Sequence, residues 1–95
     1  MKDRIETANQ ILRDATAQFL ARESGPQSLI TVTRAQFSTD LTHADVFLSV
    51  LPKDKEIAAL GLATRNRDEL KRYLKDHTKL PRIPFIVFKI EPSLA

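Results

Sequence analysis

Two strand-like segments joined by only six residues place the strongest constraint on how this chain can fold. Residues 29–37 read Leu-Ile-Thr-Val-Thr-Arg-Ala-Gln-Phe, and residues 44–51 alternate between apolar and polar side chains. Runs of β-branched and alternating residues are typical of half-buried strands. A link this short, Ser38 to His43, allows a hairpin but no crossover helix. The two segments are therefore predicted to form an antiparallel hairpin.

The first of these strands has an interruption in its apolar pattern. Ile30 and Val32 fall on one face, whereas Ala35 and Phe37 fall on the other. A β-bulge adds one extra residue to a strand and so reverses which face the later side chains occupy. We therefore predict a bulge near Thr33, which would give the strand a single apolar face.

The link contains Ser38, Asp40 and His43, which together suggest two interpretations. One is a hydrolase, but a catalytic triad needs a nucleophile and a base joined by tertiary structure, together with an oxyanion hole. The other is a structural turn, because short polar side chains satisfy the backbone of turns. We favour the turn, predict no catalytic residue and expect that the protein is not an enzyme.

The remaining segments predict three helices and a third strand. Residues 3–22 carry apolar side chains at spacings of three and four, ending at Ser24-Gly25-Pro26. Pro52 ends the second strand, and residues 53–63 are expected to form a short helix carrying Ile57 and Leu60. Residues 85–90 are expected to form the last strand, between prolines.

A break is predicted between the second helix and the third. Asn66 followed by Glu69 resembles a capping box, so a new helix should begin there and run to about His77. The order of elements is then α-β-β-α-α-β. This order predicts an α+β fold, with a three-stranded sheet packed on helices in one domain of residues 1–95.

Composition excludes several kinds of site. The 95 residues contain no cysteine, two histidines and two glycines. These exclude disulfides, thiolate metal sites and a glycine-rich phosphate loop, and the histidines lack metal-ligand spacing. We therefore predict neither a cofactor nor a metal site. No apolar segment approaches the roughly 20 residues needed to cross a bilayer, and no secretory signal is visible. A cytoplasmic protein without a membrane partner is expected.

Positive charge is concentrated in the second half of the chain. The net charge is −1 over residues 1–52 and +4 over residues 53–95. On a helical wheel, the helix that begins near Asn66 has one basic face. The opposite face holds Leu70, Tyr73, Leu74 and His77. His77 is expected to lie near the core. A basic face of this kind suits nucleic-acid phosphates. The predicted RNA-binding residues are Arg67, Lys71, Arg72, Lys75, Lys79 and Arg82, with Arg65 and Lys53 at the margin.

Two other interpretations of the basic face remain open. It could be a solvated surface, with Arg72 paired to Asp68 and Asp76 along the helix. It could also bind an acidic protein partner through charge complementarity. Tyr73 is expected at the edge of the core, and with one tyrosine and no tryptophan the chain is poorly supplied for base stacking.

Several short motifs, in the correct order, resemble the ribosome-binding factor A family. The hairpin carries Thr31-Val32-Thr33, Ala35, Ser38-Thr39-Asp40-Leu41, Ala44-Asp45-Val46 and Ser49-Val50, and weaker matches follow at Lys71, Leu74, Leu80, Pro84, Ile86, Phe88, Glu91 and Ser93. The resemblance covers nearly the whole chain. It departs from the family at Asn66-Arg67-Asp68, where an Ala-x-Gly kink is usual, and at Glu91, where Asp is more common.

The resemblance implies a fold and a function. The fold would be a type II KH-like domain. The function would be ribosome biogenesis, through binding of the small ribosomal subunit and its ribosomal RNA during late maturation and rRNA processing. The resemblance also implies a role in growth in the cold, and we expect a monomer. The Ser-x-Asp-Leu stretch would be structural.

Overall fold

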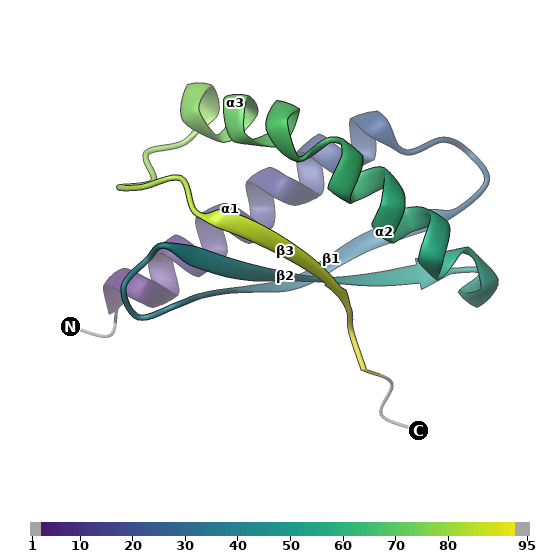
Figure 1. The fold of residues 1–95 in the computed structure, drawn as a ribbon, viewed down its shortest axis with the longest axis horizontal. Coiled ribbons are helices and arrows are strands. Elements are labelled where there is room, and N and C mark those ends of the chain that lie inside the picture. The colour runs from purple at the N-terminus through teal and green to yellow at the C-terminus, as the bar shows by residue number, and fades with distance from the viewer. Residues whose placement is uncertain (1–2, 93–95) are drawn as a thin grey trace.

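The computed structural model describes residues 3–92 and contains one three-stranded sheet packed on helices (Figure 1). The elements in chain order are α1 (Asp3–Glu23), β1 (Leu29–Phe37), β2 (His43–Leu51), the 3₁₀ turn η1 (Lys53–Lys55), α2 (Glu56–Arg65), α3 (Arg67–His77) and β3 (Phe85–Ile90). β1 pairs antiparallel with β2, and β2 pairs parallel with β3. The predicted order α-β-β-α-α-β and the α+β class are confirmed.

The predicted bulge is present in β1. Val32 pairs with Leu48 and Arg34 pairs with Phe47, so Thr33 is the extra residue. As a result Val32, Ala35 and Phe37 are all buried, although their spacing does not fit a regular strand. The bulge therefore places Val32, Ala35 and Phe37 together on the face that the helices cover.

The bulge also holds the residue that follows β3. The Thr33 hydroxyl donates a hydrogen bond of 2.7 Å to the Glu91 carboxylate, and Arg34 Nε donates a second one of 2.9 Å. The Glu91 backbone N–H bonds the Leu48 carbonyl at 2.7 Å. The hydrogen bonds from Arg34 and Thr33 lower the pKa of the Glu91 carboxyl. These contacts join the end of β3 to both other strands.

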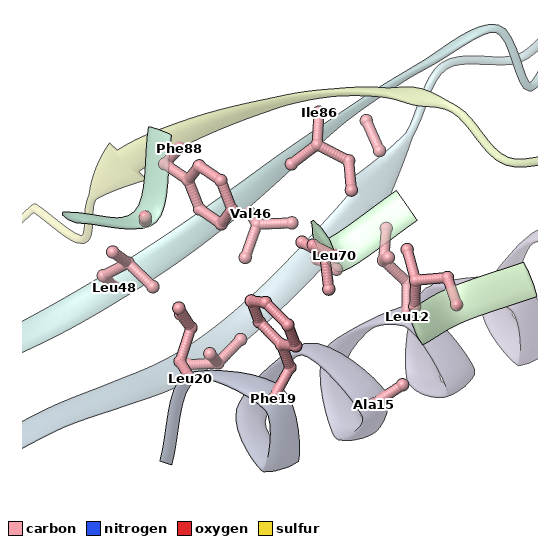
Figure 2. Packing of buried hydrophobic residues seen from close by; sticks show 14 of the residues in the cluster. Leu12, Ala15, Phe19, Leu20, Val46, Leu48, Leu70, Ile86 and Phe88 are labelled. Atoms are coloured by element: carbon pink, nitrogen blue, oxygen red, sulfur yellow. The ribbon is translucent and has the colours of Figure 1, made fainter. Parts of the chain in front are cut away.

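The core lies between α1, α3 and the covered face of the sheet (Figure 2). α1 contributes Leu12, Phe19 and Leu20, and these side chains point toward the strands. The sheet contributes alternate residues of β2 and β3, because successive side chains of a strand point to opposite faces. Leu70 of α3 completes this layer and is fully buried.

The break between α2 and α3 occurs at Asn66 as predicted, but the predicted capping box does not form. The Asn66 side chain makes no capping hydrogen bond to α3. Its Nδ2 instead donates to the Leu62 carbonyl at 2.8 Å, and its backbone N–H bonds the carbonyls of Leu62 and Ala63. Asn66 therefore satisfies the free carbonyls at the end of α2, so its side chain is not available to cap α3.

Two helix residues that were predicted to face the core are exposed. Ile57 is 85% exposed. The cause is that residues 53–55 form a 3₁₀ turn and α2 begins at Glu56, so Ala59 and Ala63 face the core instead. His77 is also exposed, whereas the wheel placed it near the core. Its ring stacks on Tyr73 at 4.3 Å, and its Nδ1 donates to the Tyr73 carbonyl at the end of α3.

Replacing Leu70 with alanine should lower the free energy of unfolding by about 2–5 kcal/mol, because it leaves a cavity between α3, α1 and the sheet. Urea denaturation measures this loss. The matched control is Ile57→Ala on the exposed face of α2, which should change stability by less than about 0.5 kcal/mol. A Leu70→Ala loss as small as that of the control would contradict the packing described here.

Candidate nucleic-acid interface

α3 has one buried face and one cationic face. Leu70 and Leu74 are fully buried, whereas Lys71, Arg72 and Lys75 are exposed. In a helix, positions 70 and 74 lie on one side, so burying both fixes the rotation of α3 about its axis. The three cations are therefore directed away from the core, as the helical wheel predicted.

The segment after α3 brings a fourth cation to the same side. The helix ends at His77 and is capped by Thr78, whose backbone N–H and hydroxyl both donate to the Leu74 carbonyl, at 3.1 and 2.6 Å. The chain then returns to the sheet through buried Pro84, and the Phe85 N–H bonds the Thr42 carbonyl at 2.9 Å. Arg82 lies on this returning segment and is exposed.

α3 and the returning segment enclose an open hollow of about 540 Å³. Its lining consists of Asp68, Lys71, Arg72, Lys75, Thr78, Leu80, Pro81, Arg82 and Ile83. We call this hollow, with Lys71, Arg72, Lys75 and Arg82, the basic groove. Four cations and one carboxylate line it, so its local charge is strongly positive.

Most cations of the basic groove have no acidic partner among the side chains that the structure describes. Over residues 3–92, Arg72 pairs with Glu69 at 3.4 Å, and no ion pair within 4 Å involves Lys71, Lys75 or Arg82. The pairs of Arg72 with Asp68 and Asp76, which belong to the alternative of a solvated surface, are not formed. The Arg72–Glu69 pair is exposed on both sides, and such pairs contribute little to stability. The groove is therefore free to attract an anion.

Arg67 is directed to a different surface. Its guanidinium lies over the Phe85 ring at 4.6 Å, and its Nε is buried with no hydrogen-bond partner among residues 4–92. Phe85 is 49% exposed and also contacts the His43 ring edge-on. Sequence analysis missed this cluster, although the position of Phe85 at the start of a half-exposed strand is a signal for it.

The other three predicted cations also lie outside the basic groove. Lys79 lines a second hollow beside the first part of α1. Arg65 is exposed at the end of α2. Its side chain lies back over Gly61, where an added Cβ atom would come within 3.1 Å of the Arg65 Nη1. Lys53 lines a separate hollow with Thr33 and Glu91. The structure thus brings together four of the predicted RNA-binding residues and separates the rest.

The loop between β1 and β2 is a hydrogen-bonded turn. Asp40 Oδ1 accepts from the Ser38 hydroxyl and the Thr42 hydroxyl, both at 2.7 Å, and from the Thr42 backbone N–H at 3.1 Å. The His43 Nδ1 lies 2.8 Å from the Thr42 hydroxyl rather than on Ser38. Ser38 is therefore not paired with the imidazole as a nucleophile would be with its base.

The part of the chain that the structure describes offers neither a metal cluster nor a membrane-spanning helix. Within residues 3–92, no three His, Asp or Glu side chains gather in a way that could hold a metal ion. None of the helices in that range is long and apolar enough to span a membrane.

Comparison with known proteins identifies the family. A family model described as ribosome-binding factor A matches residues 4–95. The chain belongs to the ribosome-binding factor A family. A member from Thermomicrobium roseum is 34% identical over 88 residues, which covers 90% of this chain and 68% of that protein. A member from Clostridioides difficile is 34% identical over 67 residues, 70% of this chain and 52% of that protein.

Solved structures of the ribosome-binding factor A family share the fold. The crystal structure of ribosome-binding factor A from Thermus thermophilus matches with a TM-score of 0.79, covering 88% of this chain and 92% of that one. A solution structure from Thermotoga maritima, titled a putative ribosome binding factor A, matches with a TM-score of 0.67 over 96% of this chain and 87% of that one. The identities are 22% and 20%. The α+β, type II KH-like fold implied by the sequence resemblance is therefore confirmed.

The carboxyl group of Asp40 should titrate near pH 2. Hydrogen bonds from Ser38, then from the side chain and backbone of Thr42, lower the Asp40 pKa from 3.8 to about 2. NMR titration of the carboxyl carbon measures this directly. Ser38→Ala should move the midpoint upward, and a wild-type midpoint near the ordinary value would contradict the turn geometry.

The same shift predicts how stability depends on pH. Because the folded-state pKa of Asp40 lies below that of the unfolded chain, the unfolded chain binds more protons between the two values. The contribution of ionised Asp40 to the free energy of unfolding is therefore present above about pH 4 and is lost as the pH falls toward 2. Urea denaturation over this range should show a shallower loss of stability in Asp40→Asn than in the wild type.

Proposed function

We propose that this protein is a ribosome assembly factor whose basic groove binds ribosomal RNA of the small subunit during late maturation. Membership of the ribosome-binding factor A family supports a ribosomal partner. The observation that carries the assignment of the site is the basic groove, where Lys71, Lys75 and Arg82 face solvent without acidic partners in residues 3–92. Such cations gain most from meeting phosphates.

The shape of the groove favours a nucleic-acid backbone. Its cations come from two elements, with α3 on one side and the segment carrying Arg82 on the other. A phosphate chain lying in the hollow would be contacted from both sides. Lysine and arginine contacts to phosphates fix the position of a nucleic acid without reading its sequence. The groove would therefore orient the protein on the RNA.

Base stacking is a weaker explanation of RNA binding by this helix. The Tyr73 ring is partly buried, and it contacts Phe19 at 5.6 Å, His77 at 4.3 Å and the Arg22 guanidinium at 5.5 Å. A ring already contacted by three side chains has little free surface for a nucleobase. Phosphate contacts are then the main source of affinity, and that affinity should fall as salt rises.

We further propose that the protein acts by binding and not by catalysis, as a monomer in the cytoplasm. The Ser38–Asp40–Thr42 hydrogen bonds support a structural role for the one loop that resembled a catalytic site. Participation in rRNA processing and in growth in the cold belongs to the same proposal, through the family.

Reversing three groove charges together, Lys71→Glu, Arg72→Glu and Lys75→Glu, should abolish binding to small ribosomal subunits. The three side chains are exposed, so the variant should fold, which circular dichroism and urea denaturation can check. Filter binding with labelled protein measures affinity for immature and mature subunits. Unchanged binding by the folded variant would show that the groove is not the RNA site.

A matched control separates a local effect from one of net charge. Arg13→Glu, Lys55→Glu and Lys89→Glu change the net charge by the same amount, at exposed positions that do not line the groove. This variant should retain most of its binding at moderate salt. If both variants lose binding equally, net charge and not the groove drives association.

If the wild type binds an acidic protein and no ribosomal RNA, the alternative of an acidic partner replaces the proposal.

Arg82→Ala should reduce the salt dependence of binding by about one phosphate contact. For single-stranded nucleic acid, the slope of log affinity against log salt should then fall in magnitude by about 0.7, and for a duplex by about 0.9. Affinity measured at four salt concentrations gives this slope. An unchanged slope with weaker binding would indicate that Arg82 supports the shape of the segment and does not contact a phosphate.

A further inference from the structure

A second hollow, next to the basic groove, is lined mainly by aliphatic side chains. It has a volume of about 580 Å³ and is lined by Arg4, Ile5, Thr7, Ala8, Ile11, Leu41, Lys79 and Pro81. Its residues come from the first turns of α1, the loop between β1 and β2, and the segment after α3. Five of them are aliphatic or proline, so we call it the aliphatic groove. Pro81 lines both this hollow and the basic groove.

Leu41 forms a wall of the aliphatic groove in an unusual backbone conformation. Its φ angle is 65°, which lies in the left-handed region that side chains other than glycine and asparagine rarely adopt. The turn holds it there, since the Leu41 N–H bonds the Ser38 carbonyl at 3.0 Å and Asp40 accepts from Thr42 on the other side. The leucine side chain packs against the edge of the core. The wall is therefore fixed before any partner binds.

Two cations flank this aliphatic surface. Arg4 and Lys79 are exposed, and among residues 4–92 neither has an acidic partner within 4 Å. Within residues 4–92, no acidic side chain lines the hollow. A partner that fits must therefore carry an apolar group to fill the groove and negative charge to meet Arg4 and Lys79.

The lining favours a protein segment over a nucleic acid. Nucleobases bind by stacking on aromatic rings or guanidinium planes and by hydrogen bonds at their edges. The aliphatic groove has no aromatic residue, the Arg4 guanidinium is its one planar group, and Thr7 is its one uncharged polar side chain. Five of its eight lining residues are aliphatic or proline, which offer a nucleobase neither a stacking plane nor a hydrogen bond. Aliphatic side chains instead pack well against Ile5, Ile11 and Leu41.

We propose that the aliphatic groove binds an acidic segment of a partner protein, with one aliphatic side chain seated in the groove and carboxylates beside Arg4 and Lys79. This contact is separate from RNA binding by Lys71, Arg72, Lys75 and Arg82. It would give the protein a second attachment point beside the first, and two linked weak contacts bind much more tightly than either alone.

The test is a titration of ¹⁵N-labelled protein with the capped peptide Glu-Asp-Leu-Ile-Glu-Asp, followed by NMR. Amide shifts should concentrate at the residues that line the aliphatic groove. Replacing the Leu-Ile pair of the peptide with serines, or its acids with lysines, should remove the shifts. A lack of shifts with the original peptide, or shifts that survive either replacement, would overturn the proposal.

A matched pair of arginine variants sharpens the test. Arg4→Glu should weaken peptide binding about fivefold, the effect expected for an exposed charge contact. Arg13→Glu, on the same helix but outside the groove, should leave binding unchanged. Both residues are exposed, so neither variant should unfold the protein. Equal weakening by both variants would overturn the assignment of the site.

Two further outcomes would replace the proposed occupant with another. Heptauridine RNA should shift basic-groove amides and leave the aliphatic groove unchanged; shifts at Ile5, Ile11 and Leu41 would mean that RNA occupies it. Diluting the protein without peptide should shift no amide; a dilution-dependent shift at those three residues would mean that a second copy occupies it. Either result would overturn the proposal, whether or not the basic groove binds RNA.

Discussion

The burial of Leu70 and Leu74 is the constraint on which the candidate RNA site depends. These two leucines anchor α3 against α1 and the sheet, and they leave one rotation of the helix that buries both. With that rotation fixed, Lys71, Arg72 and Lys75 point to solvent on the same side. The charge pattern of the groove is thus set by packing in the core, since mutual repulsion among the cations opposes their clustering.

The fold was largely predictable because its signals are local. The hairpin follows from two β-rich segments and a short link, and the bulge follows from the change of phase between Val32 and Ala35. The break at Asn66 was predicted with the wrong mechanism. The side-chain amide there bonds back to Leu62 and ends α2, and its spacing to Glu69 cannot reveal which of the two helices it caps.

The geometry of the candidate site was predictable only within α3. A helical wheel predicts that Lys71 and Lys75 point to solvent, because the helix is regular through those positions. Lys79 was misassigned to the basic face because α3 ends at His77, so the wheel no longer applies to it. The Arg67 guanidinium packs on the Phe85 ring. The two residues are 18 positions apart in the sequence, so helical periodicity does not predict this contact. Arg82 joins the groove through the path of an irregular segment, which depends on the whole fold.

Co-sedimentation tests the central claim most directly. Purified protein is mixed with immature and with mature small ribosomal subunits and run on density gradients at low and at high salt. The account predicts co-migration at low salt that is lost at high salt and is stronger with immature subunits, as expected for phosphate contacts. Protein that stays at the top of the gradient at both salt concentrations would contradict it.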